Sequence, residues 1–126
     1  MSMLKTKTEC NYDEENDILF IYRADRSPKA SIELDKNLVL DLDAKGSVCA
    51  VEIFDAIKTF SGLSEFGTSA NFFRNIKVCK LTSNQIGNLQ RLKIYVLSIA
   101  GNTKQEVEVP LIASIGGYRS PAIRYA

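Results

Sequence analysis

The chain has 126 residues and a net charge of +1, with 45% hydrophobic and 25% charged residues. A chain of this length buries a core without disulfides or metal, and this composition excludes disordered and fibrous proteins. No apolar run approaches the roughly 18 residues that span a bilayer, and residues 1–9 lack the apolar stretch of a secretory signal. We therefore expect a soluble, cytoplasmic, single-domain protein with no membrane partner.

The sequence contains no histidine, which argues against several kinds of catalysis. Ser-His-Asp and Cys-His catalysis and most zinc sites are excluded on this ground. The three cysteines, Cys10, Cys49 and Cys79, are separated by 39 and 30 residues, which matches no zinc or redox motif. We expect three reduced structural thiols, no cofactor and no enzymatic activity.

Charge is unevenly distributed along the chain. Residues 1–60 carry 8 Lys and Arg against 12 Asp and Glu, whereas residues 61–126 carry 8 against 3. Oppositely charged halves attract each other within a subunit or between subunits, and a basic half also attracts an acidic partner. Self-association is the simpler interpretation.

The first half of the chain has the residue patterns of β-strands. They occur at 9–12, 17–23, 30–35, 38–43 and 47–54, separated by the polar loop 13–16, by Pro28 and by the turn 44–46. The run 18–22 is apolar on both pleat faces, which indicates a central or doubly covered strand. Together these strands predict an antiparallel meander.

Helical signals are confined to the middle of the chain. Asp55 is a candidate N-cap for a short helix over 56–60, and Gly62 is a candidate stop. We expect residues 61–75 to form a long connection that contains a second helical turn at 69–74.

Strand patterns return at 76–81, 92–100 and 105–112, with a hairpin turn at 101–104 and an edge or bulge indicated by Pro110. We predict a mainly β fold, on the border of α+β, with an antiparallel meander, hairpins and one or two short helices. A possible subdivision separates residues 1–60 from 76–115. The expected core contains Ile18, Phe20, Ile32, Leu38, Leu40, Leu42, Val51, Ile53, Ile94, Val96, Val107 and Val109.

Two segments have the order and spacing of a known family. Residues 12–21 read Tyr-Asp-Glu-Glu-Asn-Asp-Ile-Leu-Phe-Ile, and residues 41–46 read Asp-Leu-Asp-Ala-Lys-Gly ahead of Val51-Glu52-Ile53. Over roughly residues 10–60 the chain resembles the uncharacterised family called domain of unknown function 2283, although Ala50 stands where that family often has glycine. The resemblance implies a small β-sheet module without an established activity. Some short members look like partners of toxin-like neighbours.

Asp41, Asp43 and Glu52 are candidate metal ligands. With Gly46 they fill positions one, three, twelve and six of an EF-hand calcium loop. However, Lys45 stands at position five, where that loop needs an oxygen ligand, and the flanking residues have strand patterns. The alternative is a hairpin in which the aspartates face solvent and Gly46 takes a positive φ.

A second acidic cluster comprises Asp13, Glu14, Glu15 and Asp17. It has the residue types of a metal or acid-base site. The simpler hypothesis is that Asp13 and Asp17 accept hydrogen bonds from nearby backbone amides and fix the hairpin.

The chain ends with interleaved aromatic and basic residues: Tyr118, Arg119, Arg124 and Tyr125. Proteins that bind single-stranded nucleic acids use such pairs for stacking and phosphate contacts.

Two functions remain open. The first is an interaction module that acts as a homo-oligomer or with a protein partner, because strands at 18–22 and 95–99 with apolar residues on both faces need more cover than one short helix provides. The alternative is an antitoxin-like or nucleic-acid-binding regulator that uses the basic second half.

Overall fold

A computed structural model describes residues 8–63 and 69–114. The predicted tail site, Tyr118, Arg119, Arg124 and Tyr125, lies outside these ranges. The described residues form the strands β1 (Thr8–Asp13), β2 (Ile18–Arg23), β3 (Ala30–Asp35), β4 (Leu38–Leu42), β5 (Val48–Phe54), β6 (Ile76–Ile86), β7 (Leu89–Ala100) and β8 (Thr103–Ser114), and the helices α1 (Ala56–Leu63) and α2 (Ala70–Arg74). The fold is mainly antiparallel β, as the sequence predicts.

The strands form two sheets, here called sheet A and sheet B. Sheet A has the strand order β1-β2-β5-β4-β3, and sheet B has the order β6-β7-β8. The strands β3, β4 and β5 form a meander, but β2 pairs with β5 rather than β3, so the expected meander over all five strands is wrong. The connection at residues 24–29 runs past the positions of β5 and β4 to reach β3 at the edge of the sheet. The apolar strand β2 therefore lies between β1 and β5.

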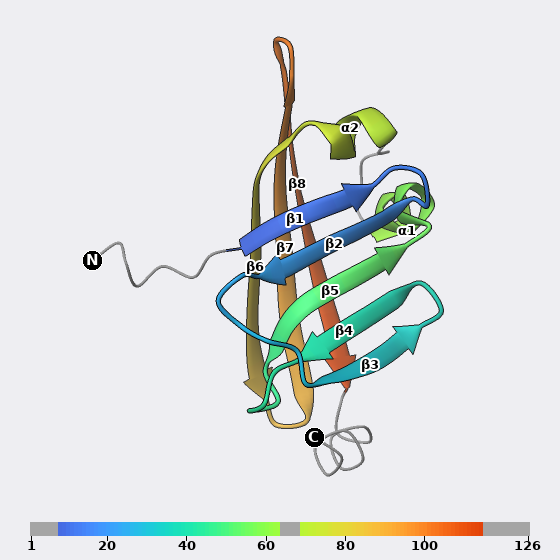
Figure 1. The fold of residues 1–126 in the computed structure, drawn as a ribbon. Helices are drawn as coiled ribbons and strands as arrows, with labels where there is room; N and C mark the ends of the chain where they lie inside the picture. The colour runs from blue at the N-terminus through green and yellow to red at the C-terminus, as the bar shows by residue number, and fades with distance from the viewer. Residues whose placement is uncertain (1–7, 64–68, 115–126) are drawn as a thin grey trace, which may run out of the picture.

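The two sheets pack face to face. Figure 1 shows sheet A in front of sheet B, with the strands of sheet B running steeply across those of sheet A. One hydrophobic cluster contains residues of both sheets together with Phe60 of α1 and Phe72 and Phe73 of α2. Full burial of each large apolar side chain contributes roughly 1.5–3 kcal/mol, so this shared interior is the main source of stability.

Most of the expected core is confirmed, but β2 faces the other way. Leu19 and Ile21 are fully buried, whereas Ile18 and Phe20 are only half-buried. In a strand with a period of two, a shift by one residue exchanges the two faces. Because both faces of β2 are apolar, its own sequence does not fix which face turns inward.

The helices differ from prediction in their ends. The backbone N–H of Ile57 donates to both carboxylate oxygens of Asp17 at 3.3 Å, so the carboxylate at the start of α1 is that of Asp17 and not that of Asp55. The helix continues through Gly62, which is therefore not a stop. The second turn is confirmed as α2, where the Ser69 hydroxyl accepts from the Phe72 N–H at 3.3 Å.

Among the described residues, no helix has the length and apolar character needed to cross a membrane.

The hairpin β6–β7 is longer than predicted. The sequence indicates strands at 76–81 and 92–100, but the ladder runs from Ile76 to Ile86 and returns from Leu89 to Ala100. Residues 82–85 are all polar and mostly exposed, so they lack the alternation by which a strand is recognised. At the far side of sheet B, β8 is an edge strand and carries Pro110, as predicted.

Candidate protein-interaction faces

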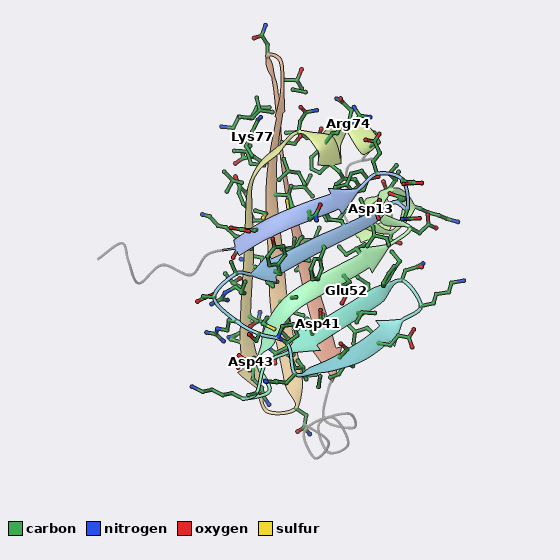
Figure 2. All side chains as sticks on the ribbon, in the orientation of Figure 1. Asp13, Asp41, Asp43, Glu52, Arg74 and Lys77 are labelled. Atoms are coloured by element: carbon green, nitrogen blue, oxygen red, sulfur yellow. The ribbon has the colours of Figure 1, made fainter. Side chains whose placement is uncertain are left out.

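Sheet A turns its outer face to solvent, and this face is acidic. Side chains alternate along each strand, so Glu9, Asp13, Glu33, Asp41 and Glu52 lie on the side opposite the core. The strand positions of this face contain no Lys or Arg. Half-buried apolar side chains lie between the acids: Ile18, Phe20, Tyr22, Val39 and Phe54. We call this surface the acidic face; Figure 2 labels Asp13, Asp41 and Glu52 along it, and neither helix covers it in Figure 1.

Two carboxyl groups near the middle of the acidic face interact directly. Asp41 is only 3% exposed, and its carboxylate accepts from the Ser31 hydroxyl at 2.6 Å. Burial, a hydrogen bond with Asp41 and the negative charge of Asp41 raise the pKa of Glu52 to about 7. Below about pH 7 the Glu52 carboxyl is therefore mostly protonated and can share a hydrogen bond with Asp41.

A hollow of about 250 Å³ opens on the acidic face beside Glu52, lined also by Asn11, Asp13, Ile18 and Phe20. Next to it the rings of Phe20 and Tyr22 are stacked with their centres 5.0 Å apart. An apolar surface bordered by carboxylates suits a Lys or Arg side chain, whose aliphatic stem packs on the ring while its charge pairs with the acids.

The outer face of sheet B has the opposite charge. Lys80, Arg91, Lys93 and Lys104 lie on it, against two acids, Glu106 and Glu108. The Lys93 ammonium lies 3.8 Å from Glu108, and that of Lys80 lies 5.5 Å from the centre of the Tyr95 ring. Within the described part of the chain, Arg91 has no ion pair.

This basic face is also apolar. Four large hydrophobic side chains are exposed among the described residues, Val78 (39%), Ile86 (51%), Leu89 (43%) and Ile112 (68%), and all four lie on the outer face of sheet B. A hollow of about 400 Å³ has Ile112, Arg91, Lys93 and Pro110 among its lining residues. Exposed apolar clusters rimmed by charge are typical of surfaces that bind another protein.

Of the residues proposed for calcium, Asp41 and Glu52 lie together, but Asp43 is held by other partners. One oxygen of Asp43 accepts from the backbone N–H of Lys45 (2.9 Å) and Ser47 (3.0 Å), and the other accepts from the Arg26 guanidinium (2.9 Å). Burial acts against ionisation, but these hydrogen bonds hold the pKa of Asp43 below its usual value. Gly46 has a φ of 82°, as the hairpin alternative predicts. Across residues 8–63 and 69–114, no group of three or more His, Cys, Asp or Glu is placed to hold a metal ion.

The second acidic cluster is occupied by structural contacts. Asp13 accepts from the backbone N–H of Asn16 at 3.2 Å and from its side-chain amide at 2.9 Å. Glu14 receives both the Nε (3.0 Å) and Nη2 (2.9 Å) of Arg74 in α2. Asp17 accepts from the Tyr12 hydroxyl at 2.6 Å as well as from α1. Tyr12 and Asp17 of the family motif thus join the β1–β2 hairpin to the start of α1, whereas Asp13 fixes the hairpin loop.

The motif resemblance is confirmed for this part of the chain. Residues 10–56 match the model of the family described as "Protein of unknown function (DUF2283)". The matched segment begins in β1 and ends at the first residue of α1, so it contains almost all of sheet A and none of sheet B.

Two relatives are similar to longer stretches. An uncharacterized protein of Methanocaldococcus jannaschii is 29% identical over 110 residues, which cover 87% of this chain and 91% of that protein. A protein of Methanosarcina mazei named putative hypoxanthine phosphoribosyltransferase is 33% identical over 66 residues, which cover 52% of this chain and 53% of that protein. No solved structure gives a significant match.

Proposed function

We propose that this protein is a non-enzymatic interaction module that self-associates head to tail, the acidic face of one copy binding the basic face of the next. The observation that carries this proposal is the opposite charge of two solvent-facing sheet surfaces that both also expose apolar side chains. The setting we propose is the cytoplasm.

The distribution of ion pairs supports binding between copies rather than within one. The acidic first half of the chain forms sheet A and the basic second half forms sheet B. Among the described residues, Glu14 and Arg74 form the one ion pair that joins the two halves. Charges that a second copy can reach instead lie on the two outer surfaces: Glu9, Asp13, Glu33 and Glu52 on sheet A, and Lys80, Arg91, Lys93 and Lys104 on sheet B.

The two faces also match in their apolar parts. Phe20, Tyr22 and Val39 on the acidic face would cover Leu89 and Ile112 of another copy, while Arg91 and Lys93 would meet the carboxylates. Because the contact joins two different surfaces, it repeats and produces a closed ring or an open chain of subunits rather than a symmetric dimer.

Light scattering coupled to size-exclusion chromatography tests this proposal. We expect a mass above that of the monomer that grows with protein concentration and falls when salt is raised from about 0.05 to 0.5 M, because screening weakens exposed charge pairs. A protein that stays monomeric at high concentration and low salt would exclude self-association.

A second candidate, a nucleic-acid-binding regulator, is supported by the basic face alone. Lys80, Arg91 and Lys93 lie on one side of sheet B with the Tyr95 ring, and Arg91 is free to contact a phosphate. Binding to a labelled single strand should then weaken steeply with salt and lose affinity in Arg91→Ala. Absence of binding at low salt would rule this candidate out.

A further inference from the structure

β1 of sheet A lies against β6 of sheet B, and we call this junction the seam. Arg23 of the neighbouring strand β2 also contacts β6 there. Cys10 of β1 pairs with Ile21 of β2, and Arg23, two residues further along β2, donates from Nη1 to the backbone carbonyl of Leu81 in β6 at 3.4 Å. Cys79 precedes Leu81 by two residues and therefore lies on the same side of β6. Cys10 and Cys79 therefore both face the interior between the sheets, Cys79 within the hydrophobic cluster and Cys10 packed against it.

The two thiols are in direct contact. A hydrogen bond from the Cys79 thiol lowers the pKa of Cys10 despite partial burial, and the same bond, together with burial, raises the pKa of Cys79. Cys79 is 9% exposed within the core cluster, whereas Cys10 is half-buried at its border. The pair therefore consists of a half-buried thiol at the border of the core and a buried thiol beside it.

The third cysteine has a different environment. Cys49 is only 1% exposed in the bulge between β4 and β5. Burial and the nearby carboxylates of Asp43 and Asp41 raise its pKa. It has neither the access nor the thiol neighbour of Cys10 and serves as an internal control.

We propose that Cys10 and Cys79 are a redox-reactive site that a small disulfide oxidises to a Cys10–Cys79 disulfide across the seam between the sheets. The Cys10 thiolate attacks one sulfur of the oxidant, forms a mixed disulfide and releases one thiol. The sulfur of Cys79, after loss of its proton, then attacks Cys10 and releases the second thiol. One oxidant disulfide is reduced to two thiols for each protein disulfide formed.

The bond would join the two sheets covalently. It would close a loop of about 70 residues, and closing such a loop restricts the unfolded chain and so stabilises the folded one. The oxidised protein should therefore melt at a higher temperature than the reduced protein. This site is independent of the proposed self-association.

The test uses the full chain, fully reduced and then incubated with glutathione disulfide. Intact mass and non-reducing peptide mapping should show the loss of two hydrogen atoms, one linked Cys10–Cys79 peptide and a Cys49 that alkylates only after unfolding. Glutathione attached to wild-type protein with no Cys10–Cys79 peptide would overturn the proposal, and so would unchanged mass.

Two variants define the order of the steps. Cys79→Ser should stop at a single glutathione adduct on Cys10, because the resolving thiol is missing. Cys49→Ser is the matched control and should form the disulfide as the wild type does. An adduct on Cys49 in Cys79→Ser, or loss of the disulfide in Cys49→Ser, would contradict the assignment, and the wild-type mapping decides the question even if a variant fails to fold.

Discussion

Asp17 joins three parts of the molecule through one carboxylate. Asp17 closes the β1–β2 hairpin with a φ of 55°, and its carboxylate accepts from the Tyr12 hydroxyl and from the Ile57 N–H of α1. Its backbone carbonyl accepts from the Ala56 N–H. A carboxylate at a helix start satisfies free N–H groups and interacts favourably with the helix dipole. This contact spans 40 residues, so the sequence predicted that Asp17 binds backbone amides but not that it caps the helix.

Replacing Asp17 with Ala should therefore lower the free energy of unfolding by about 2 kcal/mol, through loss of the helix cap and the Tyr12 hydrogen bond. Urea denaturation followed by circular dichroism measures the change. The matched control is Glu15→Ala in the same loop, which should leave stability within about 0.5 kcal/mol of the wild type. Equal midpoints for Asp17→Ala and wild type would show that the carboxylate has no structural role.

Glu52 makes stability depend on pH with a sign opposite to that of most acids. Its pKa is raised from 4.5 to about 7 in the folded protein, so the folded state binds more protons than the unfolded state between these values. Stability should fall as the pH rises from about 4.5 to 7 and stay low above it.

Glu52→Gln removes this titration and should be more stable than wild type at pH 8 by about 1 kcal/mol, with little difference at pH 4.5. Thermal melts at high salt, where association is screened, measure the difference across this range. Glu33→Gln, on the exposed part of the same face, is the control and should retain the wild-type slope. A wild-type curve that is flat between pH 4.5 and 7 would contradict the account of Glu52.

At the scale of elements, the β4–β5 turn shows why a calcium loop and a hairpin look alike in sequence. Both need acidic residues and a glycine with positive φ, but here the oxygens of Asp43 are taken by two backbone amides and Arg26. Asp43→Ala should lower stability by about 1–2 kcal/mol because these donors lose their acceptor.

Addition of millimolar calcium should leave the melting temperature of the wild type unchanged, because a ligand that binds only the folded state must raise it. Magnesium at equal ionic strength is the control for salt effects. A calcium-specific rise that disappears in Asp43→Ala would restore the metal site.

The elements themselves were predictable where one face is buried and the other exposed. In β4 and β8 the alternation of apolar and polar residues identifies both the strand and its inward face. It fails in β2, which is apolar on both faces, and in the outer part of the β6–β7 hairpin, which is exposed on both. The insertion of β5 between β2 and β4 depends on long-range pairing, which no local pattern encodes.

At the scale of the whole molecule, we propose that the chain folds as one unit despite its two sheets. Sheet A coincides with the family segment, yet the hydrophobic cluster that stabilises it includes Leu81, Ile94 and Val109 from sheet B. Denaturation monitored by tyrosine fluorescence and by far-ultraviolet circular dichroism should give coincident single transitions. Two separated transitions would indicate that residues 1–60 and 76–115 are independent subdomains.

The interaction faces were predictable only as an imbalance of charge. The sequence shows an acidic first half and a basic second half, but the fold is needed to place these halves on opposite surfaces. The exposure of Ile112, Leu89 and Ile86 beside Arg91 also depends on the register of sheet B, which was assigned only in part from sequence.

The most direct test of head-to-tail association mixes two variants, each with one reversed face. Glu9→Lys with Glu33→Lys reverses charge on the acidic face, and Arg91→Glu with Lys93→Glu reverses it on the basic face. Each variant alone should be monomeric by sedimentation velocity at low salt, because every contact needs both faces. An equimolar mixture should assemble again, since the intact acidic face of the second variant binds the intact basic face of the first and the two reversed faces are also opposite in charge. A mixture that remains monomeric, or single variants that still assemble as the wild type does, would contradict the account.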